Sequence, residues 1–164
     1  MKKIGIITIH SDLNYGAFLQ AFALTTFLNN NSYYTRIIDY RKIPNSPRIY
    51  KFPKNIIYKI YNLPRLFRYR RFIAPLLSNK RYNSLEELQS FNEEFDILIS
   101  GSDQIWNPVI FDGIDPIFLL NFSNESRKIS ISSSAGSYIF SQNEMKDVSG
   151  YLNKYDAISV REES

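Results

Sequence analysis

The chain has 164 residues, 44% of them hydrophobic, which is enough to form one globular domain with a core. It contains no cysteine and one histidine, so disulfides, thiolate chemistry and metal clusters of His and Cys are excluded. The apolar run IGIITI near the N-terminus is too short for a signal peptide or a membrane span, and this favours a cytoplasmic protein.

The net charge of +4 conceals an uneven distribution of charge along the chain. Residues 36–81 contain 13 of the 20 Lys and Arg residues and one acid, Asp39. The other residues contain 7 basic and 15 acidic side chains, so a basic segment is joined to an acidic body.

Strands and helices are expected to alternate from the start of the chain. The continuous β-branched run KIGIITI (3–9) predicts a buried strand, and TRIIDY (35–40) predicts a second one. Between them, GAFLQAFALTTFLN (16–29) predicts a helix that is apolar on nearly all sides. Such a βαβ unit implies parallel strands with a right-handed crossover.

The middle of the chain is less regular. Five prolines interrupt residues 41–80, and the spacing favours short helices at about 54–62 and 64–74, so we predict a basic helical insertion over about 41–82. Ser84 and Glu87 then predict the start of a helix that runs to about 93. Further strands are predicted at 95–100, 127–134 and 156–160, with a helix at 141–155.

This alternation predicts an α/β fold: a Rossmann-like open parallel sheet flanked by helices, formed by residues 1–164 as one domain. Ligands of such sheets bind beyond the carboxyl ends of the strands. Four polar segments, HSDLNYG, GSDQIWN, SSAG and REES, each follow a predicted strand. Parallel strands would bring all four to one edge, where we predict a binding site.

The first of these segments contains His10, the one side chain that titrates near neutrality without help from its surroundings. Its place at the end of a strand suits acid–base work, and a hydrogen-bonded structural histidine is an equal alternative. Asn14, Tyr15 and Gly16 stand at a helix N-terminus, which suits an anion or else a simple capped turn. No GxGxxG or GKS/T motif supports nucleotide binding.

The segment GSDQIWN holds Gly101, Ser102, Asp103, Gln104 and Trp106. Asp103 and Gln104 suit hydrogen bonds to sugar hydroxyls, and Trp106 suits stacking on a sugar face. The alternative is a turn anchored by Asp103, with Trp106 filling the core.

Two later segments offer groups that suit an anion. Ser134 and Gly136 belong to a hydroxyl-rich turn that can form an anion nest, and Arg161 suits the bidentate capture of carboxylate or phosphate. A salt bridge from Arg161 to a neighbouring Glu is the alternative.

The basic stretch RLFRYRRF (65–72) suits nucleic acid or an anionic membrane surface. A helix that packs its aromatic side chains on the body is the simplest interpretation.

In this order, the segments KIGIITIHSDLNYGAFLQAFAL, DILISGSDQIWNP, ISISSSAGS and DAISVREES resemble the polysaccharide pyruvyl transferase family. The likeness spans most of the chain, while the basic middle carries no recognisable motif. It implies the N-terminal domain of a two-domain transferase similar in architecture to GT-B glycosyltransferases. The GSDQIWN loop would then lie on the cleft between two Rossmann-like domains.

The resemblance also implies a reaction. Pyruvate would pass from phosphoenolpyruvate to two hydroxyls of a sugar, forming a ketal on a cell-surface polysaccharide or its lipid-linked precursor, with no metal or other cofactor. Arg161 falls in the family's S-x-R-[DE] segment, which implies a donor-binding role. We therefore predict donor binding by Arg161, Ser134 and Gly136, and substrate binding by His10, Asn14, Tyr15, Gly16, Gly101, Ser102, Asp103, Gln104 and Trp106.

The family's general acid is thought to be a histidine of the second domain, and His10 does not match it. We therefore expect these residues to be an N-terminal half, as a fragment or a degenerate member, that is inactive without the missing C-terminal domain. The enzyme would act in the cytoplasm, at the inner face of the membrane, which residues 48–72 would contact. The alternative function is a non-catalytic module that binds a sugar, a sugar nucleotide or, through the basic stretch, nucleic acid.

Overall fold

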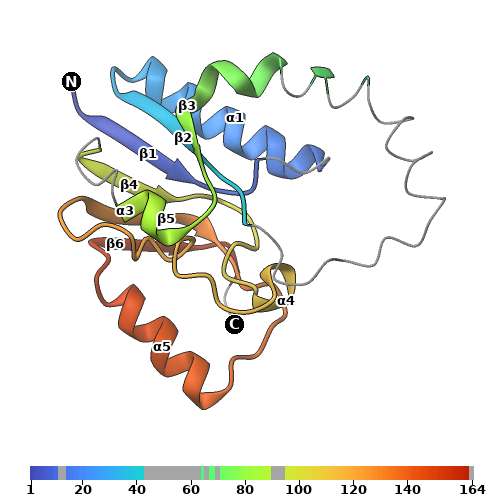
Figure 1. The fold of residues 1–164 in the computed structure, drawn as a ribbon, viewed down its shortest axis with the longest axis vertical. Coiled ribbons are helices and arrows are strands. Elements are labelled where there is room, and N and C mark those ends of the chain that lie inside the picture. The colour runs from blue at the N-terminus through green and yellow to red at the C-terminus, as the bar shows by residue number, and fades with distance from the viewer. Residues whose placement is uncertain (11–13, 43–63, 65–66, 69–70, 90–94, 163–164) are drawn as a thin grey trace.

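A computed structural model describes residues 1–164 apart from 11–13, 43–63, 65–66, 69–70, 90–94 and 163–164. Its regular elements alternate along the chain as the sequence predicts (Figure 1). The strands are β1 Lys3–Ile7, β2 Tyr34–Tyr40, β3 Leu77–Tyr82, β4 Ile97–Ser100, β5 Arg127–Ser133 and β6 Ala157–Val160. The helices are α1 Tyr15–Asn30, α3 Leu85–Gln89, α4 Pro108–Phe111, α5 Gln142–Leu152 and the short 3₁₀ helix η1 Ala74–Leu76.

The six described strands form one sheet in the order β3-β2-β1-β4-β5-β6, and every neighbouring pair is parallel. Figure 1 shows them in this order, with β3 at one end of the sheet and β6 and α5 at the other. The chain builds outward from β1 in one direction and then restarts at β4 in the other. The direction therefore reverses between β1 and β4, where sheets of this kind bind their ligands. The Rossmann-like open parallel sheet is confirmed.

Strand β3 corrects the prediction of a helical insertion over 41–82. Helical residues are present at 71–73 and continue into η1, but residues 77–82 then form an edge strand that pairs with β2. Its sequence, LSNKRY, lacks the apolar alternation of a half-buried strand, because three of its side chains face solvent. The predicted helix at 54–62 lies outside the described residues.

Two apolar clusters cover the two faces of the sheet. On one face Ile4, Ile6 and Ile37 pack with Ala21 of α1 and with Ile73. Small residues on the inner side of α1, Ala17, Ala21 and Thr25, let this helix lie close to the strands. The opposite face packs against α3, α4 and the loop that follows α4, with a buried set of Ile7, Ile38, Tyr40, Tyr82, Leu88, Phe95, Leu98, Ile105, Ile117, Phe118, Leu120 and Phe122.

Local signals explain where the helices begin. The Asn14 side chain accepts hydrogen bonds from the backbone N–H groups of Gly16 and Ala17, which caps α1. Ser141 and Glu144 form a reciprocal capping box at the start of α5. Strand β6, which α5 leads into, has four exposed side chains and borders one neighbour among the described strands.

Gly5 of β1 lies in the tightest part of the core. A Cβ atom at this position would stand 2.7 Å from Cδ2 of Phe95 and 3.0 Å from Cδ1 of Ile38. We expect Gly5→Ala to lower the free energy of unfolding by about 1–3 kcal/mol, because the core must shift to admit the methyl group. Urea-induced unfolding followed by circular dichroism measures this change.

Gly150 of α5 supplies a matched control, because a Cβ atom there would meet no atom within 4 Å. Gly150→Ala should stabilise the protein by about 0.5–1 kcal/mol, the ordinary advantage of alanine within a helix. Equal stability of the two alanine variants would contradict the packing described around β1.

Candidate functional site

The exits of the described strands meet along the carboxyl edge of the sheet. The backbone N–H of Gly101, after β4, donates to the carbonyl of Ile7 in β1 over 2.8 Å. A Cβ atom on Gly101 would come within 3.0 Å of Thr8 Cβ, so only glycine lets these two exits approach so closely. The predicted convergence of the strand ends therefore exists at the point where the chain direction reverses.

The loops after β4 and β5 are joined by backbone hydrogen bonds. Asp103 forms a parallel bridge with Ser133, the N–H of Ser134 donates to Asp103 O over 3.0 Å, and the N–H of Trp106 donates to Ser134 O over 3.1 Å. These bonds continue the β4–β5 ladder past the ends of both strands. They fix GSDQIWN and SSAG as one unit.

The loop after β6 joins this unit through Arg161. Its Nη2 donates to Ser134 Oγ over 3.4 Å, its Nε donates to Glu162 Oε1 over 2.8 Å, and its backbone N–H donates to Ser133 O. Ser134 Oγ also accepts the N–H of Gly136 over 2.8 Å. The three predicted donor-binding residues thus lie together, and the salt bridge considered as the alternative for Arg161 is formed as well.

Gly136 has a φ of +62°, a conformation that favours glycine. A Cβ atom there would stand 2.8 Å from Oε1 of Gln104, which already accepts a hydrogen bond from Asn107. The contact holds the turn after β5 against the GSDQIWN loop.

Asp103 and Trp106 already have partners within the protein. Asp103 Oδ1 accepts the N–H of Gln104 over 2.7 Å. The indole N–H of Trp106 donates to Phe118 O over 3.3 Å, and its ring meets the edge of Tyr155 with the centroids 6.5 Å apart. Trp106 is partly buried against the core, as its structural alternative predicts. Ser102 is likewise partly exposed on this edge.

His10 is buried, and it points along the edge toward β2. Its Nε2 lies 3.0 Å from Asp39 Oδ1 and its Nδ1 lies 3.1 Å from the carbonyl of Thr8. Both ring nitrogens therefore face oxygen atoms. His10 therefore links the exits of β1 and β2, as a structural histidine does.

The Asp39 carboxylate is the centre of a charged cluster. Besides His10, it accepts hydrogen bonds from Arg41 Nε over 2.8 Å and from Arg81 Nε, on β3, over 3.1 Å. Burial raises the pKa of the Asp39 carboxyl, but the hydrogen bonds from His10, Arg41 and Arg81 outweigh it and lower that pKa well below its ordinary value. The carboxyl is therefore ionised at any physiological pH.

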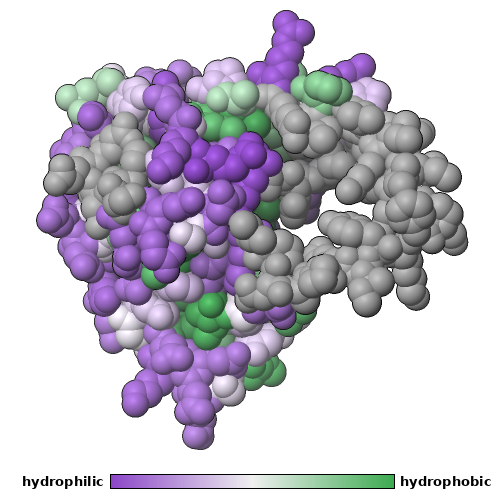
Figure 2. All heavy atoms as spheres, viewed as in Figure 1, coloured by the Kyte–Doolittle hydropathy of each residue, from purple (hydrophilic) through white to green (hydrophobic). Residues whose placement is uncertain are grey.

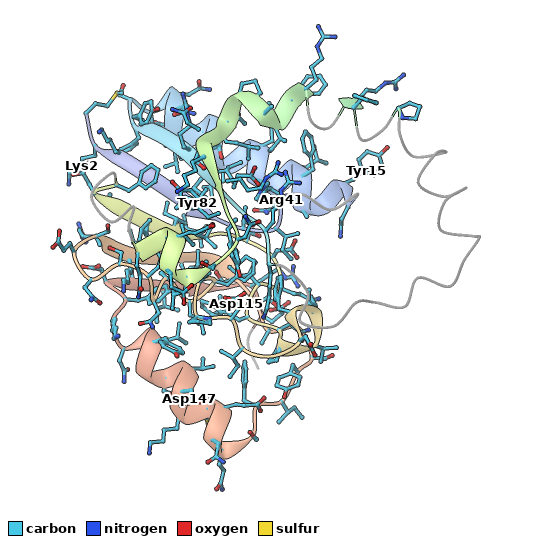
Figure 3. All side chains as sticks on the ribbon, in the orientation of Figure 1. Lys2, Tyr15, Arg41, Tyr82, Asp115 and Asp147 are labelled. Carbon is cyan, nitrogen blue, oxygen red and sulfur yellow. The ribbon has the colours of Figure 1, made fainter. Side chains whose placement is uncertain are left out.

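A second buried carboxylate, Asp115, is labelled in Figure 3 and bonds to Tyr40, whose side chain points to the face of β2 opposite Asp39. It accepts the hydroxyl of Tyr40 over 2.8 Å and the N–H of Ile117 over 3.0 Å, and Lys42 Nζ stands 3.6 Å away. Burial, and then the charge of Asp115, raise the pKa of Tyr40. This network attaches the loop after α4 to the end of β2.

Comparison with known families shows the family of the chain. A family model described as "Polysaccharide pyruvyl transferase" matches residues 14–164. The chain belongs to the polysaccharide pyruvyl transferase family. Comparison with curated proteins and with solved structures gave no match.

In this pyruvyl transferase family member, the start of α1 is the plainest of the predicted features. Asn14 acts as an N-cap, Tyr15 is exposed, and Gly16 is exposed beside the cap. Binding of a substrate by these three residues remains a prediction, as it does for the GSDQIWN residues.

Sequence reasoning missed Asp39, Arg41 and Arg81 as members of the edge. One signal was available, because Asp39 is the single acid among thirteen basic residues of 36–81 and it ends a predicted strand. No comparable signal marks Arg81, since the strand that carries it is polar.

The described part of the chain shows neither a metal cluster nor a membrane-spanning helix. It contains no group of three or more His, Cys, Asp or Glu side chains placed to hold a metal ion. No helix within the described ranges is long and apolar enough to cross a membrane.

The charged cluster predicts the effect of Asp39→Asn. Removing the carboxylate leaves the buried His10 and two arginines without their acceptor charge, so the free energy of unfolding at pH 7 should fall by about 3 kcal/mol. Asp156→Asn is the control, because Asp156 is exposed, pairs with Arg127 and accepts the backbone N–H of Lys128, so its loss should lower the stability much less than the loss of Asp39. Urea denaturation of both variants measures the difference.

The same variant predicts a pH dependence. A carboxyl whose pKa is lower in the folded state stabilises the protein above the unfolded-state pKa of about 4, and this contribution is lost as the pH falls below it. The stability difference between wild type and Asp39→Asn should therefore shrink from pH 5 to pH 3. A difference that stays constant over this range would show that the Asp39 charge is not what the variant removes.

Proposed function

We propose that these residues form the acceptor-side half of an enzyme that transfers pyruvate from phosphoenolpyruvate to two hydroxyls of a sugar. The ketal product would belong to a cell-surface polysaccharide or its precursor. One observation carries the proposal: in a chain of this family, Asp103, Ser134 and Arg161 are joined by hydrogen bonds at the carboxyl edge of the sheet.

The chemistry explains why this arrangement suits such a reaction. Phosphoenolpyruvate carries a carboxylate and a phosphate, and both groups need cationic or N–H donors. Arg161 is held by Ser134 and Glu162, so its guanidinium is oriented before a ligand arrives. Asp103 uses Oδ1 for its own loop, and a sugar hydroxyl suits the other oxygen.

Ketal formation also needs an acid that protonates the methylene carbon of the enol. His10 is the only histidine of the sequence, and it is buried with both ring nitrogens facing oxygen acceptors. We therefore place the acid outside these 164 residues, in a second domain that would close over the edge in the manner of a GT-B enzyme.

Ligand binding tests this assignment. Arg161→Gln should weaken phosphoenolpyruvate binding about tenfold, because one charge-assisted contact is lost, and calorimetry measures the change. Arg127→Gln, at the first residue of β5 and thus at the opposite edge, should bind as wild type does. Asp103→Ala should weaken the binding of a sugar, measured by NMR with glucose, galactose and N-acetylmannosamine, and leave phosphoenolpyruvate unaffected.

Two results would contradict the proposal. One is acceptor-dependent release of phosphate from phosphoenolpyruvate by the 164-residue chain alone, since that would mean the acid is already present. The other is an equal loss of phosphoenolpyruvate binding in Arg161→Gln and Arg127→Gln, since that would mean a non-specific charge effect.

We also propose that the enzyme works at the inner face of the cytoplasmic membrane. Much of the predicted contact segment, 48–72, lies outside the described residues, but Phe67 and Phe72 are 66% and 60% exposed beside the exposed Arg68 and Arg71. Ile73 packs with α1, which has no charged residue and exposes Leu19 and Phe27. Apolar side chains among cations suit an anionic lipid surface. Figure 2 shows that the face in view is otherwise largely hydrophilic.

Vesicle co-sedimentation tests this proposal. The protein should pellet with phosphatidylglycerol vesicles more than with phosphatidylcholine vesicles, and the double variant Phe67→Ser, Phe72→Ser should lose most of that binding. The control is Val109→Ser, Ile139→Ser, which removes side chains that are 74% and 89% exposed elsewhere. If the control loses as much binding as the test variant, the segment around 64–72 is not a lipid contact.

A further inference from the structure

The two arginines that hold Asp39 form a fixed pair at the end of the sheet. Arg41 follows β2 and Arg81 lies in β3, and their Nε atoms bond to the two different oxygens of one carboxylate. Asp39 is itself placed by the ladder, which pairs it with Arg81, and by the bond from its N–H to Ser78 Oγ. The two guanidinium groups are thus held close together by a buried anchor.

Each arginine uses one donor of several for this contact. A guanidinium has five N–H groups, and its Nε–H accounts for one of them. Among the described residues, Arg41 and Arg81 each donate one hydrogen bond to another side chain, Asp39, and it runs through Nε in both cases. The side chains are 30% and 55% exposed, so their outer edges can be reached from solvent.

The charges at this place do not balance. Asp39 supplies one negative charge, whereas Arg41 and Arg81 supply two positive charges, and the ring of His10 also faces the carboxylate. Asp115, with Lys42 and Tyr40, lies on the other face of the sheet and cannot neutralise them. The Asp39 carboxylate lies between the two guanidinium groups, but its single charge leaves an excess of positive charge that a second anion would offset.

The position of the pair suits a ligand. It lies on the carboxyl edge, on the face of the sheet that α1 covers. If the β1–β2 register is continued by two residues, Thr8 stands beside Asp39, and Gln20 of α1 donates a hydrogen bond to Thr8 Oγ1. Arg161 follows β6, four strands from β2, so the two cationic places are about 20 Å apart at a strand spacing of about 4.8 Å. A single small donor does not reach both.

We propose that Arg41 and Arg81 form an oxyanion site, which takes a phosphate or carboxylate group of a ligand lying along the edge. The two outer edges of the guanidinium groups bind the oxygens, and Asp39 keeps both arginines in place in the empty site. The site itself does not depend on pyruvyl transfer. If the proposed function holds, its distance from Arg161 assigns it to an acidic or phosphorylated sugar acceptor.

Binding of inorganic pyrophosphate at low salt tests the site directly, by calorimetry or NMR. Arg81→Gln should weaken binding about tenfold or more, since charge-assisted contacts are lost. Arg41→Gln should do the same. Arg127→Gln removes an equally exposed arginine at the other edge and should bind as wild type does. Thermal unfolding of each variant shows whether it is folded. If Arg41→Gln does not fold, Arg81→Gln alone carries the test.

A second pair of titrations identifies the source of the anion. If Arg81→Gln weakens the binding of glucose 1-phosphate and Arg161→Gln weakens the binding of phosphoenolpyruvate, the Arg41 and Arg81 pair is an acceptor site. If Arg81→Gln, and not Arg161→Gln, weakens the binding of phosphoenolpyruvate, the oxyanion site is supported but the donor role of Arg161 is overturned. Unchanged pyrophosphate affinity in Arg81→Gln, or an equal loss in Arg127→Gln, overturns the inference.

Discussion

The negative charge of Asp39 holds one half of the carboxyl edge together. A buried carboxylate is unfavourable unless donors surround it, and here the donors come from three separate places: His10 after β1, Arg41 after β2 and Arg81 in β3. The burial cost of one group is offset by three contacts, and each contact fixes the exit of a different strand. The other half, formed by β4, β5 and β6, is held by backbone hydrogen bonds and by Ser134. The pairing of β1 with β4 and the bond from the N–H of Gly101 to Ile7 O join the two halves.

Much of this fold could be predicted from the sequence, for physical reasons. Strands β1 and β4 are largely buried on both faces, which leaves short, nearly continuous apolar runs, while β2 and β5 keep β-branched residues among their polar ones. Capping residues such as Asn14 and Ser141 mark the helix starts. Edge strand β3 was missed, because three of its six side chains are exposed in succession, Arg81 among them, and this leaves no alternation of apolar and polar residues. The site shows the same limit. Polar residues at strand ends predicted the edge, but partners distant in sequence, such as His10 with Asp39, follow only from strand order.

The two halves of the edge differ in what they offer a ligand. Around GSDQIWN, most polar groups already bond to one another, as Asp103 does with Gln104 and Trp106 with Phe118. Such a loop is rigid, and it offers shape and a few remaining acceptors. Around Asp39, the groups left over are cationic and partly exposed. The proposed acceptor, a sugar that carries an acidic group, would place its hydroxyls against the first half and its acidic group against the second.

Strand β5 contains an irregularity with a consequence for this surface. Ser130 pairs with Ile158 and Ser133 pairs with Val160, so three steps along β5 match two along β6, with Ser132 at a φ of 51° as the extra residue. Side chains of a strand alternate between the two faces of the sheet, so this one inserted residue moves each later side chain of β5 to the opposite face. Ser133 therefore bonds to Ser100 on the inner side, and Ser134 is turned to meet Arg161. In a strand one residue shorter, the hydroxyl and the guanidinium would face opposite sides of the sheet.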